Sequence, residues 1–398
     1  MAQVDLNLDP YTFFSMQDDR RAKIDAAPAA PLPKTYPVNE AAKALHPDHQ
    51  YLKVAAIEDH GSAKSFTLVP DPARGTSHCA YFRAGQYLSV QLNINGAALS
   101  RPYSIRSGPG DVTKYDHYIL TIKRNPNGFA SNYILDNWQI GTEVVTSGPA
   151  GQFNYSPVRD AKKVIALAGG SGITPFFSLA SAVVDGLEDC DLTLLYGSRT
   201  VKDILFKNEF DEMMQRCKRI KVVYVLSDED ASGCQRGLLT AKLIKKYAPK
   251  LQHYSLFICG PQGMYNFLEK EIATLNLSAK YVRHELFGAY QHPEKDPAYP
   301  QKSIGQTYCI TVQIRDTEQK IICPAGETLL CAMERAGIAA PALCRSGICG
   351  YCHSRLVSGT VYVPQSVDGR RLADLKFGFI HPCCTFPTSD VVIDVPVK

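Results

Sequence analysis

Four cysteines constrain this 398-residue chain more than any other feature of its sequence. Cys344 and Cys349 have four residues between them, Cys349 and Cys352 have two, and Cys383 follows 31 positions after Cys352. Cysteine thiolates at this spacing are the ligand set of a plant-type 2Fe-2S cluster. Glycines between the first three cysteines favour the same interpretation, because glycine lets a backbone wrap closely around a cluster. The sequence therefore predicts an iron–sulfur centre, which moves one electron at a time.

A structural zinc site is the alternative for the same cysteines. Structural zinc prefers two separate short Cys-x2–4-Cys pairs, and this region offers only one. We therefore favour a 2Fe-2S cluster over zinc at these four positions.

Length and composition indicate a soluble globular protein of two to four domains. Hydrophobic residues make up 45% of the chain and charged residues 21%, which is ordinary for this class. The net charge of +4 is too small to suggest a nucleic-acid or membrane partner. Thirteen cysteines, with no basic region leading into an apolar segment at the N-terminus, favour a reducing, cytoplasmic location.

The chain changes character several times along its length. Residues 1–48 look like an extended arm of unknown role, with a short helix at 39–45. Short strand-like segments separated by Gly, Pro and Asn, among them 103–106, predict a small antiparallel barrel over 49–157. Strands alternating with helices over 158–289 predict a parallel sheet covered on both faces. Residues 290–305 have the composition of a linker, and 306–398 carry the four cysteines.

One uncharged segment, 164–184, is long enough to cross a membrane. Its central glycines and Pro175 would break such a helix, so we expect a buried strand, a tight turn and a helix there.

A four-residue motif, Arg101-Pro102-Tyr103-Ser104, ends the barrel's strand pattern. An arginine can clamp a phosphate, a tyrosine can cover a flat ring, and a serine hydroxyl can bond a ring nitrogen. The motif alone is weak, because a tyrosine in a strand is more often a core residue.

A second candidate follows Lys123 and consists of Gly128, Phe129, Ala130 and Ser131. A glycine turn leading into a helix, expected here over 131–136, presents backbone N–H groups to a phosphate. An ordinary loop with a serine cap is an equally good interpretation of this stretch by itself.

The third motif lies between an apolar strand and a helix and contains Gly170, Gly172, Thr174 and Pro175. This is the phosphate-cradling arrangement of nucleotide-binding α/β sheets. Pro175 stands where a dinucleotide fingerprint has its third glycine, and it suits the first turn of a helix. No Gly-Lys-Ser/Thr follows, so the segment is not a P-loop.

A later strand of the same predicted sheet ends in Cys259, Gly260 and Pro261. Ligands bind at the carboxyl ends of such strands. A buried core thiol is the alternative for Cys259.

Together and in this order, these motifs resemble the ferredoxin–NADP reductase-like family over about residues 51–398. The likeness is to its three-part reductases with a C-terminal plant-type ferredoxin domain, the phthalate dioxygenase reductase and hybrid-cluster-protein reductase group. It implies an antiparallel FAD-binding β-barrel, an NAD(P)H-binding α/β domain with a parallel sheet, and an α+β 2Fe-2S ferredoxin domain. The continuation Ile105-Arg106-Ser107 resembles the members that bind FAD rather than FMN.

The resemblance also implies roles for individual residues. Arg101 would hold a flavin phosphate, Tyr103 would pack on the isoalloxazine, and Ser104 would face its reactive nitrogen. Further flavin contacts are expected at Pro102, Lys123, Gly128, Ala130 and Ser131. The pyridine nucleotide is expected at Gly170, Gly172, Thr174 and Pro175, with its nicotinamide beside Cys259, Gly260, Pro261 and Met264.

Three residues are expected at the reaction centre, Ser104, Cys259 and Glu285. Glu285 belongs to a His-Glu-Leu-Phe string that resembles the strand closing the flavin domain, and the sequence assigns it no specific role. In the ferredoxin part, the family places the fourth ligand five residues after Gly378, which favours Cys383, although Cys384 beside it leaves the choice open.

Nucleotide preference is argued from Asp228, which follows a predicted strand and Ser227. NADP-using relatives have an arginine here that pairs with the 2′-phosphate. A carboxylate, with Glu229 and Asp230 beside it, would repel that phosphate and can accept a hydrogen bond from a free ribose hydroxyl. A solvated acidic turn is the alternative interpretation. Arg199 argues for NADPH, because it could reach the 2′-phosphate. We give the acidic residues more weight and expect NADH.

The resemblance thus implies an NADH-dependent iron–sulfur flavoprotein reductase that sends electrons from NADH through FAD and a 2Fe-2S cluster to a separate acceptor protein. An oxygenase, a hybrid-cluster protein or another redox enzyme would fit as acceptor. One alternative is a self-contained flavin oxidoreductase acting on a small molecule, which would need a further pocket near the flavin. A non-enzymatic redox sensor is another, and the complete nucleotide motif argues against it.

Overall fold

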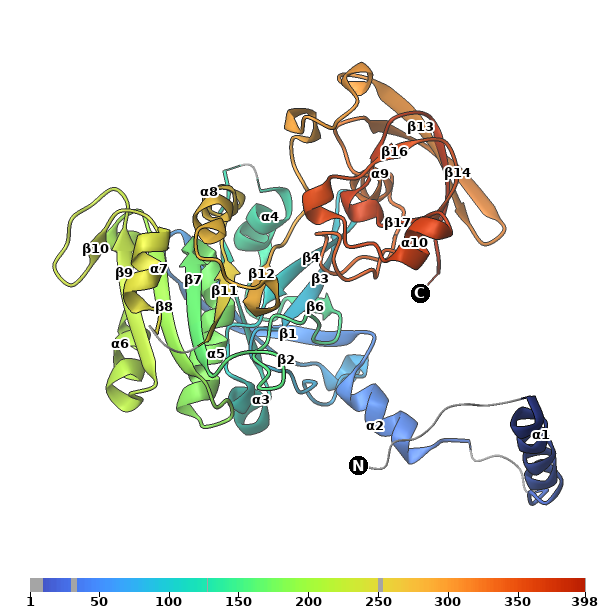
Figure 1. Cartoon of the computed structure of the whole chain (residues 1–398), viewed down its shortest axis with the longest axis horizontal. Helices are drawn as coiled ribbons and strands as arrows, with labels where there is room; N and C mark the ends of the chain where they lie inside the picture. Colours follow the sequence, from blue (N-terminus) through green and yellow to red (C-terminus); the bar gives the residue numbers. More distant parts are fainter. Residues whose placement is uncertain (1–9, 30–33, 127, 250–252, 398) are drawn as a thin grey trace. The chain divides into compact units, whose positions relative to one another are not determined.

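The computed structural model describes residues 10–29, 34–126, 128–249 and 253–397 (Figure 1). Contacts divide the chain into two units, the first ending at Ala44 and the second beginning at Leu45. The first contains α1 (Pro10–Asp25) and most of α2 (Pro37–Leu45). The expectation of an extended arm before residue 39 was therefore wrong. α1 carries no apolar stripe, and its side chains from Phe14 on are exposed, so the hydrophobic period that signals a helix is missing.

The second unit begins with a six-stranded antiparallel sheet. Its strand order is β4-β3-β6-β1-β2-β5, formed by β1 (Gln50–Asp59), β2 (Ala63–Pro70), β3 (Tyr87–Ile94), β4 (Ala97–Ser104), β5 (Tyr118–Lys123) and β6 (Glu143–Thr146). A bridge between Ile105 and Leu120 joins the end of β4 to β5, the two edges of the sheet, and so closes the predicted barrel. The fully buried Phe66, Leu68 and Leu88 lie in its core.

Strand β4 starts six residues earlier than the sequence predicted. The turn Asn95-Gly96, with both residues at positive φ, joins β3 to β4 as a hairpin. Residues 97–100 lack the β-branched and aromatic side chains that usually mark a strand, so pairing with β3 rather than local preference makes them one. Two helices belong to this region, α3 (Pro109–Tyr115) and α4 (Phe129–Asn137).

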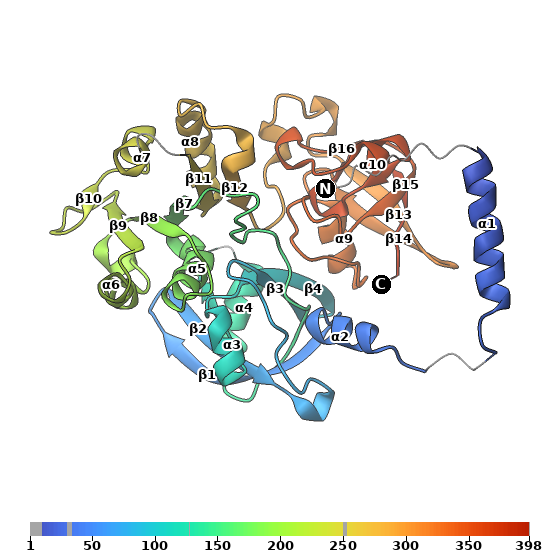
Figure 2. The same ribbon diagram turned by 60° about the horizontal axis from the view of Figure 1, so that its bottom comes forward.

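The second sheet is parallel, as predicted, and has the order β10-β9-β8-β7-β11-β12. Its strands are β7 (Lys163–Gly169), β8 (Asp191–Ser198), β9 (Ile220–Leu226), β10 (Gln235–Arg236), β11 (Tyr254–Cys259) and β12 (Val282–Glu285). The core divides into two apolar clusters, one with α5 (Thr174–Val184) and α6 (Lys207–Arg216), the other with α7 (Ala241–Tyr247) and α8 (Gln262–Ala273). Figures 1 and 2 show these two helix pairs on opposite faces of the sheet. Chain order reverses between β7 and β11, which is where such sheets bind ligands.

The uncharged segment 164–184 is divided as expected into β7, a short 3-10 turn (Gly170–Ile173) and α5. Among the residues that the structure describes, no helix has the length and apolar character needed to cross a membrane.

The third sheet has the order β14-β13-β19-β15-β17. It consists of β13 (Thr307–Ile314), β14 (Thr317–Pro324), β15 (Ser354–Ser358), β17 (Phe379–Ile380) and β19 (Val391–Asp394). Helices α9 (Leu329–Arg335) and α10 (Leu372–Lys376) accompany it, together with the pair β16 (Val361–Tyr362) and β18 (Phe386–Pro387). The mixture of strands and short helices is the predicted α+β domain.

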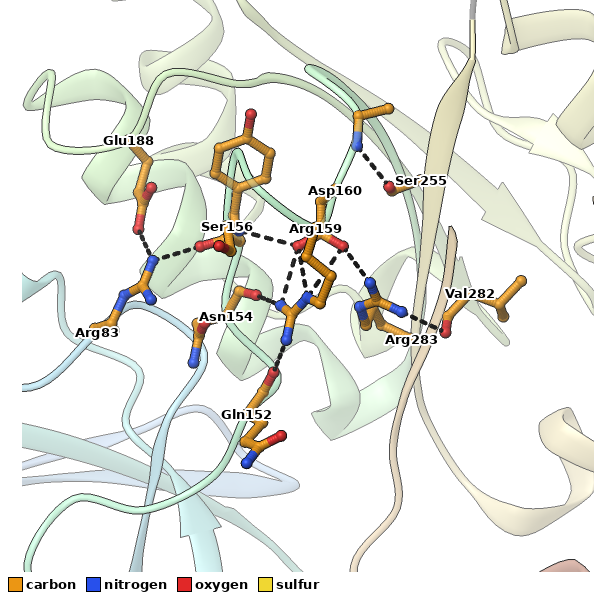
Figure 3. A network of polar contacts seen from close by, with 12 residues as sticks. Arg83, Gln152, Asn154, Ser156, Arg159, Asp160, Glu188, Ser255, Val282 and Arg283 are labelled. Atoms are coloured by element: carbon orange, nitrogen blue, oxygen red, sulfur yellow. Dashed lines mark hydrogen bonds and ion pairs between the residues drawn. The ribbon is translucent and has the colours of Figure 1, made fainter. Parts of the chain in front are cut away.

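A buried ionic network fixes the connection between the first two sheets (Figure 3). The Asp160 side chain is fully buried, and its Oδ1 lies 2.8 Å from Arg283 Nη2 on β12. Its Oδ2 accepts a hydrogen bond from the Ser156 backbone and pairs with Arg159. Arg83, from the barrel, donates to the Tyr155 carbonyl in the same segment. The segment between β6 and β7 is therefore tied to both sheets.

Candidate functional site

The four predicted cluster cysteines form two pairs. The Cys344 and Cys349 side chains are hydrogen-bonded to each other, and so are those of Cys352 and Cys383, while Cys383 also contacts the Cys384 side chain. Two sulfurs for each of two irons is the donor set that a 2Fe-2S cluster requires. The described residues contain no group of three or more Cys, His, Asp or Glu able to hold one metal ion. A two-iron cluster does not need such a group, since each iron takes two cysteine sulfurs.

Backbone N–H groups point at the sulfurs of this loop. Ser346 N lies 3.4 Å from Cys344 Sγ, and Tyr351 N lies 3.4 Å from Cys349 Sγ. Hydrogen bonds to ligand sulfurs are one of the protein's means of setting a cluster's potential. The residues present therefore fit a thiolate-bound cluster.

Cys383 and Cys384 differ in their surroundings. Gly347 N donates to Cys383 Sγ at 3.2 Å. Cys344 and Cys349 accept hydrogen bonds from backbone N–H groups of the same loop. The Cys384 thiol instead donates to the His381 carbonyl at 3.5 Å. A Cβ at Gly347 would lie 2.8 Å from Cys384 Sγ, so only glycine fits between the loop and this second thiol. These contacts favour Cys383 as the fourth ligand.

The predicted flavin residues lie on β4. Ser104 is buried and pairs across the sheet with Tyr87 of β3, while Tyr103 pairs with Leu88. Burial raises the pKa of Tyr103, so its phenol remains neutral. Tyr87 is 2% exposed, and its ring meets the edge of Phe287 with centroids 5.1 Å apart.

Tyr87 was not singled out in the sequence, yet it lies where the flavin and cluster regions meet. Burial, followed by the charges of Cys349, Cys344 and Glu285, raises the pKa of its phenol. The ring is thus within electrostatic range of three cluster cysteines, Cys344, Cys349 and Cys383, while it pairs across the sheet with Ser104. A tyrosine at the start of a strand carries no local signal for such a position.

Arg101 is held by a different part of the chain from the one expected. Its Nη1 donates to the Ser100 carbonyl at 2.8 Å and lies 3.3 Å from Glu334 Oε2 on α9. Among the described residues, no hydrogen bond or ion pair joins Arg101 directly to Gly128 or Ser131, and its grouping with them at a phosphate stays a prediction.

Helix α4 begins at Phe129, two residues before its predicted start, with Gly128 as its N-cap. A Cβ at Gly128 would lie 2.3 Å from Ser131 Oγ, so this position needs glycine. Ser131 therefore lies in the first turn rather than at the cap. The free N–H groups of that turn remain suited to a phosphate.

A cavity of about 430 Å³ opens at the carboxyl ends of β7, β8 and β9. Among the predicted residues, Gly170, Pro261 and Met264 line it, and so does Lys123, which was expected among the flavin contacts. Arg199 and Ser227, considered in the argument on nucleotide preference, also line it, whereas the sequence missed Leu238, Leu239 and Phe267. Phe267 follows Met264 by one helical turn on α8, and that spacing was an available signal.

Glycine is required where the two strand ends meet. A Cβ at Gly172 would lie 2.3 Å from the Cys259 carbonyl oxygen, and one at Gly260 would lie 2.5 Å from Met264 Cε. The Thr174 hydroxyl donates to the Ser171 carbonyl at 3.1 Å, which holds the turn, and Pro175 occupies the first turn of α5. The turn before α5 is therefore closely packed against the end of β11 and fixed in its conformation.

Cys259 and Glu285 are direct neighbours in the parallel pair of β11 and β12. Both are buried, and Glu285 Oε2 has no hydrogen-bond partner among the described residues. Burial, with Glu285 as the second cause, raises the pKa of the Cys259 thiol. Burial, with Cys344 second, raises the pKa of Glu285 well above its ordinary value. Tyr265, which donates to the Glu285 carbonyl at 2.5 Å, holds this strand end in place.

Asp228, in the acidic turn after β9, is paired with two neighbouring side chains. Arg199 Nε lies 2.8 Å from Asp228 Oδ2, and the Ser227 hydroxyl donates to Oδ1 at 2.6 Å. Those two contacts lower the pKa of Asp228, with the hydrogen bond from Ser227 the larger cause. Arg199 and Ser227 line the cavity. Asp228 contacts both of these residues and so lies beside the cavity.

Three domain families match this chain. The Oxidoreductase FAD-binding domain matches residues 74–155, the Oxidoreductase NAD-binding domain residues 166–270, and the 2Fe-2S iron-sulfur cluster binding domain residues 312–388.

Known proteins align with most of the chain. The chain is 28% identical to the glycine betaine monooxygenase reductase subunit of Chromohalobacter salexigens, over 87% of this chain and 95% of that one. It is 30% identical to the ferredoxin reductase component of 3-ketosteroid-9-alpha-monooxygenase of Mycobacterium tuberculosis, over 78% of this chain and 84% of that one. The solved structure of phthalate dioxygenase reductase shares the fold, with a TM-score of 0.61 and 23% identity over 91% of this chain and 100% of that one.

Proposed function

This chain belongs to the family of three-domain iron–sulfur flavoprotein reductases, and from that premise we propose that it is the reductase component of an oxygenase system. It is an NADH oxidoreductase that passes electrons through FAD and a 2Fe-2S cluster to a separate acceptor protein. The oxygenase class of that acceptor is our inference, supported by relatives whose own names join them to monooxygenases.

One structural observation gives the strongest support to this electron path from NADH through FAD to the cluster. Glu285 pairs with Cys259, the residue expected at the nicotinamide, and it interacts electrostatically with Cys344 of the cluster loop. If the nicotinamide lies at Cys259 as expected, the end of β12 would lie between the point where electrons enter and the cluster from which they leave. Such a position suits a protein that divides a hydride into single electrons.

The chain's own residues supply binding and exclusion of water. When bound, FAD accepts the hydride and the cluster carries single electrons away. The glycine cradle before α5 would hold the nucleotide phosphates, and Tyr103 would cover one face of the flavin. Buried Ser104 would face the flavin nitrogen. Burial raises the pKa of Glu285 and so favours its protonated form, which would lie near the flavin ring.

We assign the domains from the same pattern. The proposed flavin-binding barrel covers 49–157, the nucleotide-binding domain 158–289, the linker 290–305 and the ferredoxin domain 306–398, and the arm 1–48 receives no role. A cytoplasmic location is proposed because all thirteen cysteines are free thiols, which suits a reducing compartment.

Reconstitution with an oxygenase tests the proposal. The purified protein is combined with the terminal oxygenase encoded nearest to its gene, and NADH- and oxygen-dependent product is measured with each component omitted in turn. We expect product only with both proteins, and none when Cys349→Ser replaces the wild type. Turnover of a small molecule by the reductase alone, unchanged in Cys349→Ser, would instead establish the self-contained flavin oxidoreductase.

A further inference from the structure

A single buried carboxylate, that of Glu334, joins the flavin strand to the cluster loop. The flavin strand is β4, which carries the expected flavin residues, and the cluster loop is the segment 344–352, which carries the first three cluster cysteines. The Glu334 side chain is 3% exposed and contacts two guanidinium groups, Arg101 at 3.3 Å and Arg345 at 2.5 Å. Arg101 belongs to β4, three residues before Ser104, and Arg345 directly follows the cluster ligand Cys344. The two arginines are 244 positions apart in the chain, and Glu334 is their common partner.

Further contacts reinforce the same junction. The Ser100 backbone donates to Glu334 Oε1 at 3.3 Å, and the Ser100 hydroxyl donates to the Ala342 carbonyl at 3.2 Å. A Cβ at Gly337, after α9, would lie 3.2 Å from the carbonyl of Gly96 in the β3–β4 turn. Strand β4 is therefore bound at several points to the segment that leads into the first cluster ligand.

The cluster side of the junction is rigid. Arg345 is 2% exposed and has a φ of +60°, a left-handed conformation that costs a non-glycine residue energy unless its surroundings hold it. Its Nη2 also contacts Cys331 Sγ at 3.3 Å. The position of the Cys344 backbone thus depends on where Glu334 holds Arg345.

Stability alone does not explain the arrangement. Replacing a buried ion pair with apolar residues is often neutral or stabilising, so such pairs are weak sources of stability. What the three residues provide is a fixed geometry, since a guanidinium binds a carboxylate in a defined orientation. A flexible tether would keep the ferredoxin domain nearby without orienting it.

We propose that Arg101, Glu334 and Arg345 form an interdomain clamp that positions the cluster loop against the flavin strand for electron transfer. Building on the proposed electron path, this gives Arg101 a second role. Its Nη1 faces Glu334, while its remaining N–H groups are available for a flavin phosphate. Flavin binding and docking of the ferredoxin domain therefore share one side chain.

The two half-reactions separate this role from the proposed function. Holoprotein with saturating FAD is mixed anaerobically with NADH, and flavin reduction and cluster reduction are followed by absorbance and electron paramagnetic resonance. Glu334→Gln keeps the shape but removes the charge. We expect its flavin to be reduced at the wild-type rate and its cluster about ten- to 100-fold more slowly, the effect of a small misplacement.

Ser100→Ala is a second variant for the same measurement, to be used if Glu334→Gln fails to assemble a cluster. It removes the hydrogen bond to Ala342 without changing any charge, and we expect about fivefold slower cluster reduction. Arg74→Gln is the matched control, because Arg74 and Glu143 form an exposed pair of 2.8 Å within the same barrel. This control should match the wild type in both steps.

A double-mutant cycle then tests the pairing itself. If Arg101 and Glu334 act as one unit, Arg101→Gln combined with Glu334→Gln slows cluster reduction no more than either change alone. Hydrogen exchange of 97–104 should also rise in Glu334→Gln, a readout that does not depend on turnover. Wild-type cluster reduction in Ser100→Ala and Arg101→Gln, both with full flavin and iron, would overturn the clamp. Failure of NADH to reduce the wild-type flavin would instead overturn the proposed function.

Discussion

Arg199 and Asp228 form an ion pair at the rim of the nucleotide cavity, with Nε and Oδ2 2.8 Å apart. The pair changes the reasoning on nucleotide choice. Asp228 does more than repel a phosphate, because it pairs with Arg199, an arginine of this rim that could otherwise bind the phosphate. A 2′-phosphate would have to displace the carboxylate, whereas a ribose hydroxyl would not.

The first prediction follows from that pair. Asp228→Asn should free Arg199 and raise the ratio of NADPH to NADH kcat/KM about tenfold, because a charge-assisted contact to the phosphate becomes possible. Asp230→Asn is the control, because Asp230 pairs with Arg236, at 3.9 Å, instead of with Arg199. A wild type that prefers NADPH, or an unchanged ratio in Asp228→Asn, would show that the pair does not set nucleotide choice.

The second prediction concerns the network around Asp160. Asp160→Ala leaves Arg159 and Arg283 without their buried partner, so we expect a loss of about 3–5 kcal/mol in the free energy of unfolding. Asp189→Ala is the control, because Asp189 pairs with Lys162 and Arg219 but is 77% exposed. Its loss should stay below about 1 kcal/mol. Equal losses in urea denaturation would contradict the assigned role of burial.

The third prediction is a pH dependence. Between about pH 4.3, where an unfolded glutamate ionises, and the raised pKa of folded Glu285, the folded protein keeps a proton that the unfolded chain has lost. Stability therefore falls as pH rises through this window, by about 1.4 kcal/mol per pH unit. Glu285→Gln stays neutral and should lack this slope.

Melting temperatures of holoprotein from pH 5 to 8 measure the effect. The difference between Glu285→Gln and wild type should widen steadily with pH. The exposed Glu212 supplies the control variant Glu212→Gln, whose curve should run parallel to the wild type. A parallel curve for Glu285→Gln as well would mean that Glu285 is ionised throughout.

The fourth prediction separates the adjacent cysteines. Cys383→Ser should lose the visible absorbance of the cluster and its iron, because Cys383 is paired with Cys352 and accepts the Gly347 N–H. Cys384→Ser should keep both. The reverse pattern of iron content would move the fourth ligand to Cys384.

The sequence predicted the fold well where the pattern is local. The parallel sheet predicted over 158–289 from alternating strands and helices is the sheet formed by β7 to β12. The glycine turn between β7 and α5 was also correct, because only glycine fits against the Cys259 carbonyl. Local sequence was insufficient for β4, whose first residues become a strand through pairing with β3.

The site was harder to predict, because its arrangement depends on contacts between distant residues. The family resemblance implied that Arg101 holds a flavin phosphate, which stays a prediction, but nothing in the motif indicated its partner Glu334 on a helix of another domain. Tyr87 and Arg345 gave no periodic or spacing signal of their own. A charged residue in the apolar helix α9 was the one available hint, since buried carboxylates are almost always paired.

Anaerobic titration with NADH tests the central claim most directly. The purified protein should contain one flavin and two irons per chain, and NADH should bleach first the flavin and then the cluster, with three electrons taken up in all. In Cys349→Ser the flavin should still bleach, with two electrons taken up. Zinc in place of iron in anaerobically prepared protein, or a cluster that stays oxidised after the flavin is fully reduced, would contradict the account.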